Sequence, residues 1–137
     1  MSLRFSPIAI ADAATYTVKE YNSGVKHILP QLASADITIT MPAAKKGLHY
    51  RFEYGGAAIS AYDWVIQIPS GYYIGGVVWL TNGTPDIETV YSDGNSNDFC
   101  RILIPGAGTW VEMTCDGTNW YVNGQSVSTS TPAFADT

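Results

Sequence analysis

The 137-residue sequence is poor in charged side chains and has no long apolar run. Charged residues make up 14% of the chain and hydrophobic residues 46%, which argues against a disordered protein. No apolar segment is long enough to span a membrane, and the N-terminus lacks the apolar block of a signal peptide. We therefore expect one soluble domain that contacts no membrane and is not exported by the usual route.

Basic residues are also few, and the formal net charge is −5. An acidic chain is a poor nucleic-acid binder, because binding to phosphates needs a basic surface. Six of the seven basic residues lie in residues 1–51, and nine of the twelve acidic residues lie in residues 52–137. Either the charges are scattered and solvated, or the N-terminal part docks on an acidic partner.

The residues that support catalysis are scarce as well. His27 and His49 are the only histidines, and no nucleophile motif accompanies them, so we expect both on polar strand faces. The histidines and the two cysteines lack the spacing of a metal site. Glu88 and Glu112 lie on expected strands, but nothing in the sequence shows that they converge. We expect no enzyme and no cofactor.

The loop Asp93-Gly-Asn-Ser-Asn-Asp98 has oxygen-bearing side chains at alternating positions, as some calcium loops do. The glutamate that completes an EF-hand loop is absent, and the same residue types are ordinary turn formers. The turn interpretation is favoured, and the calcium interpretation stays open.

What the chain has in abundance are strand and turn residues, including thirteen glycines and seven prolines. Short alternating segments recur at the spacing of an antiparallel sandwich or barrel. We predict an all-β antiparallel β-sandwich that is jelly-roll-like. The expected strands before the last part of the chain are 15–21, 25–29, 36–42, 48–56, 63–69, 72–80 and 87–91.

Residues 98–124 predict a three-strand meander with turns at 105–108 and 116–119. In this register the buried face collects one apolar set: Cys100, Ile102, Ile104, Val111, Met113, Cys115 and Val122. The opposite face collects Arg101, Trp110, Glu112, Thr114, Tyr121 and Asn123. Cys100 and Cys115 would be diagonal neighbours about 7–8 Å apart. That separation is too large for a relaxed disulfide, so we expect two buried free thiols.

The ends and one glycine pair complete the domain prediction. Residues 1–13 are expected to form an N-terminal arm, residues 14–125 the sandwich and residues 126–137 a Ser/Thr-rich C-terminal tail. The three-residue NSG turn predicts a hairpin of strands 15–21 and 25–29. Gly75 and Gly76 predict a bulge or a close backbone approach.

Two segments resemble structural proteins of tailed bacteriophages. These are TITMPAAKKGLHYRFEY (38–54) and EMTCDGTNWYVNG (112–124), and the resemblance covers about residues 15–124. Such modules occur in capsid decoration (cement) proteins, head fibres and tail-fibre domains, which are generally homotrimers. The resemblance implies a non-enzymatic virion protein on the capsid surface, assembled in the host cytoplasm. Its partner would be the major capsid protein or another virion protein. The alternative is a receptor- or carbohydrate-binding fibre module.

The chain contains four tryptophans, nine tyrosines and four phenylalanines, more than one small core needs. Exposed aromatic side chains serve protein interfaces, and they also serve sugar-stacking surfaces. A trimer interface is the favoured use, ahead of the second face of the sandwich and of glycan binding. The predicted interface residues are Arg4, Phe5, Pro7, Ile8, Tyr72, Tyr73, Trp79, Trp110 and Tyr121.

Overall fold

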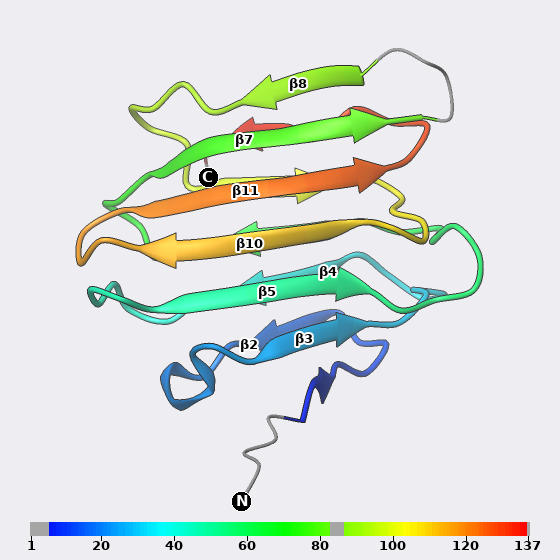
Figure 1. Ribbon diagram of the computed structural model, residues 1–137, viewed down its shortest axis with the longest axis horizontal. Helices are drawn as coiled ribbons and strands as arrows, with labels where there is room; N and C mark the ends of the chain where they lie inside the picture. Colours follow the sequence, from blue (N-terminus) through cyan, green and yellow to red (C-terminus); the bar gives the residue numbers. More distant parts are fainter. Residues whose placement is uncertain (1–5, 83–86, 137) are drawn as a thin grey trace, which may run out of the picture.

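Alternating apolar and polar residues form the strands of two packed β-sheets in the computed structural model, which describes residues 6–82 and 87–136 (Figure 1). The first strands are β1 (Ile8–Ala9), β2 (Thr15–Thr17), β3 (Lys26–Leu29), β4 (Ile37–Thr40), β5 (His49–Tyr54) and β6 (Trp64–Gln67). The later strands are β7 (Ile74–Thr81), β8 (Ile87–Tyr91), β9 (Phe99–Ile102), β10 (Trp110–Cys115), β11 (Trp120–Val127) and β12 (Ala133–Ala135). No helix in this part of the chain is long and apolar enough to cross a membrane.

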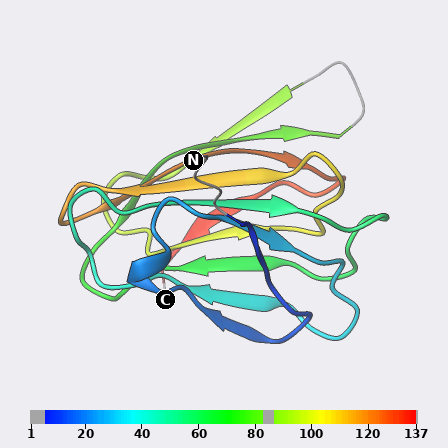
Figure 2. The same cartoon turned by 60° about the horizontal axis from the view of Figure 1, so that its bottom comes forward.

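The larger sheet has seven strands in the order β1-β3-β5-β10-β11-β7-β8. The smaller sheet has five strands in the order β12-β9-β6-β4-β2. Figure 1 looks onto the larger sheet with the smaller sheet behind it, and Figure 2 shows the two layers from below. The predicted β-sandwich is therefore confirmed.

The sheets are mixed, so the prediction of an antiparallel sandwich is wrong in this respect. Five of the ten strand pairings are parallel, among them β3 with β5 and β4 with β6. The reason is the path of the chain. From β2 to β7 it changes sheet after every strand, so successive strands within one sheet run in the same direction. The jelly-roll strand order is not confirmed by this topology.

The core lies between the two sheets and contains the inward-facing residues of both. Its largest fully buried side chains include Trp64 from the smaller sheet, and Tyr50, Phe52 and Trp120 from the larger sheet. Along β5, buried Tyr50, Phe52 and Tyr54 alternate with partly exposed residues, as period-two geometry requires. The hydrophobic pattern of each strand therefore determines its inner face.

The prediction for residues 98–124 is half right. The turn at 116–119 joins β10 to β11 with Cys115 opposite Trp120 and Met113 opposite Val122, as predicted. β9, however, pairs with β6 and β12 in the smaller sheet, so there is no three-strand meander. Ile104 has a φ of 34° and is only partly buried, because the chain crosses between the sheets there. Both cysteines are free and buried, as predicted, but they lie in opposite sheets.

The predicted N-terminal hairpin is wrong. β2 ends at Thr17, and a 3-10 helix (Glu20–Asn22) follows it. β2 then lies in the smaller sheet and β3 in the larger sheet. The NSG segment is thus part of a crossing between sheets rather than a turn within one.

Both ends of the chain contribute strands. Ile8 and Ala9 pair with β3, and the Ile10 side chain is buried, so this part of the expected arm lies on its own domain. β11 continues to Val127, and β12 pairs with β9. Much of the expected C-terminal tail therefore belongs to the sandwich.

Gly76 confirms the expected close backbone approach. Its φ is 114°, and a Cβ at this position would overlap the backbone of Val122 on β11. Glycine adopts this conformation without the strain that an L side chain would add. The contact lies on the parallel pairing of β7 with β11, where Gly76 is opposite Val122.

Candidate binding face

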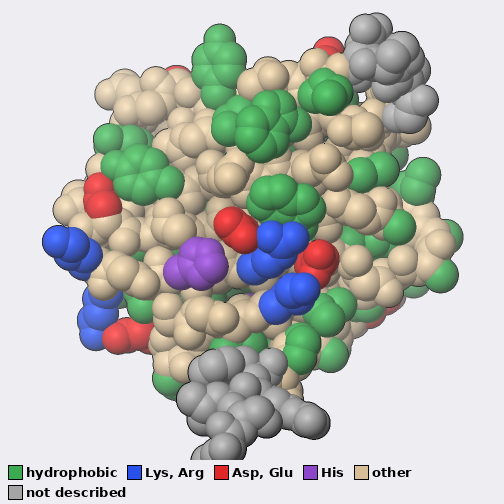
Figure 3. Space-filling view, in the orientation of Figure 1, with side chains coloured by type: hydrophobic (Ala, Val, Ile, Leu, Met, Phe, Trp, Pro, Cys, Tyr) green, Lys and Arg blue, Asp and Glu red, His purple; other side chains and the backbone are tan. Residues whose placement is uncertain are grey.

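The outer surface of the larger sheet carries a group of aromatic side chains that the rest of the described chain leaves partly uncovered. We call this group the aromatic face, and it consists of Trp79, Tyr91, Trp110 and Tyr121. They lie on β7, β8, β10 and β11, which are consecutive in the sheet. Trp79 is 39% exposed, Tyr121 42% and Tyr91 74%. Figure 3 shows hydrophobic side chains over this half of the sheet, among polar ones.

Strand register places the two tryptophans in one row across the sheet. Trp110 is opposite Gln125, and Gln125 is opposite Trp79 on the other side of β11. With one strand between them, their Cα atoms are about 10 Å apart. The side chain between the two indoles is therefore an amide.

Local contacts hold two of the four aromatic rings in place. The Arg51 guanidinium lies 4.5 Å from the centroid of the Trp110 ring, and its Nη1 is 2.8 Å from Glu112 Oε1. The Tyr121 ring lies over Gly75, where a Cβ would be 3.2 Å from the ring. The Tyr121 hydroxyl donates to Asp116 Oδ2 at 2.9 Å, a hydrogen bond that raises the pKa of Tyr121. Rings held in this way lose little conformational entropy when a partner binds.

The charges beside the aromatic face are paired with each other. Lys26 Nζ lies 2.8 Å from Glu53 Oε2, and this hydrogen bond is the largest cause that lowers the pKa of Glu53. Arg51 contacts both Glu53 and Glu112. These two cations and two carboxylates cancel, so they give this surface no net charge.

The structure brings together three of the predicted interface residues and separates others. Trp79, Trp110 and Tyr121 share the aromatic face. Ile8 lies on β1, at the opposite edge of the same sheet, and Pro7 precedes it. Arg4 and Phe5 lie outside the described residues.

The two neighbouring tyrosines lie in the loop before β7. Tyr72 is 43% exposed, and the Tyr73 backbone N–H donates to Asn119 Oδ1 at 3.3 Å. They therefore flank the aromatic face rather than belong to it. Tyr91, which the sequence reasoning did not select, belongs to it, and the alternation Ile87, Thr89, Tyr91 was the signal that could have identified it.

One histidine prediction is wrong. His27 is fully buried and packs against Tyr16, Tyr50 and Phe52. Its Nδ1 lies 3.0 Å from the Val25 carbonyl oxygen, whereas its Nε2 is buried without a partner. Burial lowers the pKa of His27. His49 is partly exposed on the outer side of β5, as expected.

The predicted acidic candidates form no reactive pair. Glu88 lies opposite Leu80 on the inward side of β8, whereas Glu112 is on the outer side of β10. Two strands, β11 and β7, separate them. Among the residues that the structure describes, no cluster of three or more metal-ligating side chains occurs, and no pocket is found.

The Asp93 loop uses its oxygens within the loop. Asp93 Oδ1 accepts the N–H groups of Asn95 and Ser96 at 2.9 and 3.0 Å, and such bonds lower the pKa of Asp93 to about 2. Asp136 accepts from Ser96 Oγ and from Asn97 Nδ2, both at 3.0 Å. The geometry favours the turn interpretation.

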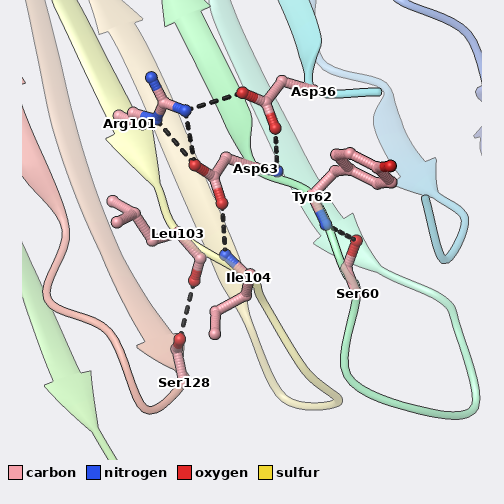
Figure 4. A network of polar contacts seen from close by, with 8 residues as sticks. All are labelled: Asp36, Ser60, Tyr62, Asp63, Arg101, Leu103, Ile104 and Ser128. Carbon is pink, nitrogen blue, oxygen red and sulfur yellow. Dashed lines mark hydrogen bonds and ion pairs between the residues drawn. The ribbon is translucent and has the colours of Figure 1, made fainter. Parts of the chain in front are cut away.

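A second polar cluster lies at the smaller sheet and has a structural role (Figure 4). Arg101 on β9 reaches Asp63 with Nε at 2.8 Å and Asp36 with Nη2 at 2.7 Å. Asp63 Oδ1 accepts the N–H of Ile104 at 2.8 Å. The cluster thus supports the residue with positive φ at which the chain leaves the smaller sheet.

Comparison of the chain with family models, with curated proteins and with solved structures found no match.

Proposed function

We propose that this protein is a capsid decoration (cement) protein of a tailed bacteriophage, which acts as a homotrimer and has no enzymatic role. The segments 38–54 and 112–124, which resemble phage structural proteins, support this proposal. The observation that carries it is the aromatic face, a group of partly exposed rings beside charges that largely pair with each other. Aromatic anchors of this kind dominate the binding energy of protein interfaces.

The proposed mechanism is stabilisation by added contact area. Burial of apolar surface contributes roughly 25 cal/mol per Å², so each partly exposed ring adds on the order of 1–3 kcal/mol. Three copies of a weak contact in one trimer raise the overall avidity strongly. Because the trimer would bind only assembled shells, it shifts the assembly equilibrium toward them by mass action.

The test uses the purified protein and a panel of empty, expanded tailed-phage heads. We expect a trimer by light scattering and co-sedimentation with matching heads. Trp79→Ala should weaken co-sedimentation about tenfold or more while the fold persists. Tyr21→Ala is the matched control, because Tyr21 is 83% exposed in the 3-10 helix, outside the aromatic face. A protein that neither trimerises nor binds any head would contradict the proposal.

A second candidate function is carbohydrate binding, as in a fibre tip. The observation that favours it is the row Trp110, Gln125, Trp79, in which an amide lies between two indoles. Indole rings stack on apolar sugar faces, and the amide can hydrogen-bond to hydroxyl groups. Saturable binding on a glycan array, lost in Trp79→Ala and retained in Tyr21→Ala, would support this function over decoration.

A further inference from the structure

β8 leaves one edge of the larger sheet open. It is the last strand in the sheet order and pairs with β7 alone among the described strands. Four of its five residues are exposed, including Ile87 at 65%. Figure 2 shows β8 standing away from the rest of the sandwich. Strand edges of this kind are templates for pairing with another chain, and proteins usually block them with proline, lysine or a bulge. Residues 87–91 contain neither proline nor lysine.

The hydrogen-bonding groups on the open edge follow from the register with β7. Ser92 donates its N–H to the Gly76 carbonyl oxygen at 3.2 Å, so this pair belongs to the hydrogen-bonded set. In an antiparallel ladder such pairs alternate with non-bonded ones. Val90 and Glu88 therefore face β7 with their backbone groups. The backbone N–H and C=O groups of the other three strand residues point to the open edge: Ile87, Thr89 and Tyr91.

We propose that two copies of this chain pair antiparallel through β8, about a twofold axis at Thr89. This places Ile87 opposite Tyr91 of the partner subunit, and Thr89 opposite the partner's Thr89. An aromatic residue opposite a β-branched one, and threonine opposite threonine, are both favourable cross-strand pairs. All three residues that point their backbone groups outward then form hydrogen-bonded pairs. The strand IETVY is therefore complementary to itself when it is reversed.

The charge on β8 is compatible with this pairing. Glu88 would lie opposite the partner's Val90 rather than opposite a second carboxylate. The two Glu88 side chains would be diagonal neighbours about 7–8 Å apart, which weakens the contact modestly. Charged side chains on the inward side of an edge strand are one way in which proteins limit edge pairing. We therefore expect a reversible dimer, and we expect Glu88→Gln to tighten it.

The second copy is favoured over other partners because the same contact also joins the aromatic faces. Trp79 on β7 is paired with Thr89 on β8, the residue through which the proposed twofold axis passes. Pairing of the two β8 strands would make one continuous outer surface with the aromatic faces of both copies. This inference does not rest on the decoration function, and a twofold contact at β8 is compatible with a threefold contact elsewhere. A five-residue ladder is smaller than a standard stable interface, so the association should depend on concentration.

The decisive variant is Thr89→Pro, measured by sedimentation equilibrium over a range of concentrations. The Thr89 N–H points away from β7, so proline at this edge position removes a donor from the open edge and none from the sheet. We expect the dissociation constant of the twofold contact to rise at least about tenfold, because two central hydrogen bonds are lost. Thr89→Ala keeps the N–H and should stay within about threefold of the wild type.

Disulfide trapping gives an independent measurement that does not need proline to be tolerated. Thr89 and the partner's Thr89 would have Cα atoms about 5.5 Å apart, within disulfide range. With oxidised glutathione as the oxidant, Thr89→Cys should form a covalent dimer as two thiols lose two electrons to glutathione. Thr118→Cys is the matched control, because Thr118 is exposed in the turn at 116–119, away from β8. The native thiols are buried.

The outcomes separate this inference from the decoration proposal. Self-association that Thr89→Pro weakens, together with specific trapping of Thr89→Cys, supports the β8 contact whether or not phage heads are bound. Self-association that is unchanged by Thr89→Pro, or equal trapping of Thr89→Cys and Thr118→Cys, overturns it. If Thr89→Pro does not fold, trapping and the effect of Glu88→Gln decide. Binding to phage heads by a Thr89→Pro trimer would leave the decoration proposal standing.

Discussion

Replacement of Asp63 by alanine is the sharpest test of how the chain crosses between the two sheets. The Asp63 side chain is only 12% exposed, and its two oxygens have different tasks. Oδ1 accepts the Ile104 N–H at 2.8 Å, and Oδ2 accepts from Arg101 Nε at 2.8 Å. Ile104 has a φ of 34°, a conformation that costs a non-glycine residue on the order of 1–2 kcal/mol. The contact with Asp63 stabilises this conformation.

The magnitude follows from the contacts that Asp63→Ala removes. Loss of the hydrogen bond from Ile104 to a charged acceptor costs about 1.5–3 kcal/mol. The ion pair with Arg101 adds about 1 kcal/mol, a small value because the Arg101 side chain is 39% exposed. We therefore expect a loss of about 3 kcal/mol in the free energy of unfolding, or roughly 10 °C in Tm. Asp63→Asn is the matched control, because its side-chain carbonyl oxygen can still accept the Ile104 N–H while the ion pair with Arg101 is lost, and it should cost only about 1 kcal/mol. Asp36→Ala is unsuitable as a control, because Asp36 Oδ1 also accepts the Asp63 N–H at 2.9 Å.

Urea unfolding followed by tryptophan fluorescence measures both variants. Trp64 and Trp120 are fully buried, so their emission reports global unfolding. Far-ultraviolet circular dichroism should give the same midpoint if unfolding is two-state. An Asp63→Ala variant that loses no more stability than Asp63→Asn would refute the role assigned to the Ile104 contact.

Three further predictions concern the core. Met113→Asp should prevent folding, because an unpaired carboxylate would be buried between the sheets. A cooperative thermal transition near that of the wild type would show that the Met113 side chain does not face the core. Gly124→Ala should cost about 1–3 kcal/mol, because its Cβ would lie 2.5 Å from the Trp110 carbonyl oxygen, and unchanged urea midpoints would contradict this close approach. Burial lowers the pKa of His27 below its ordinary value of 6.5, so the unfolded chain binds more protons as the pH falls through that value, and the wild type should lose stability toward acid. His27→Phe removes this proton uptake, so the unfolding free energy of the variant should rise relative to that of the wild type as the pH falls from 7 to 5. Parallel pH profiles of the two proteins would count against a buried neutral imidazole.

The candidate binding face was partly predictable from the sequence. Alternation in β10 and β11 placed Trp110 and Tyr121 outside and Met113 and Val122 inside, because each strand has its own period of two. Trp79 followed in the same way from β7. Tyr91 was missed because β8 overhangs the core, so that almost all of its residues are exposed and its pattern is weak.

Residue type misled the prediction at particular positions. His27 shares the inward parity of Leu29 in β3, so the strand pattern placed it in the core although its polarity suggested the surface. Ser128 lies in a segment whose composition resembles a solvated tail, yet its Oγ donates to the Leu103 carbonyl oxygen at 2.7 Å and is buried. For Ser128 this tertiary partner offsets the cost of burying a polar group, whereas His27 has only the local Val25 carbonyl oxygen and the aromatic rings around it.

The sequence by itself determined most of the strands between β2 and β11, the buried side of strands such as β5, β10 and β11, and the tight turn at 116–119. These features depend on side-chain periodicity and on turn residues that are close in the sequence. The tertiary structure alone decided which sheet each strand joins, and hence that β9 and β10 lie on opposite sides of the core. The PGAG segment has the composition of a hairpin turn, but Asp63, far away in the sequence, binds Ile104 and supports the crossing of the chain to the other sheet. Strand pairing depends on such long-range contacts, and a pattern within one strand does not contain them.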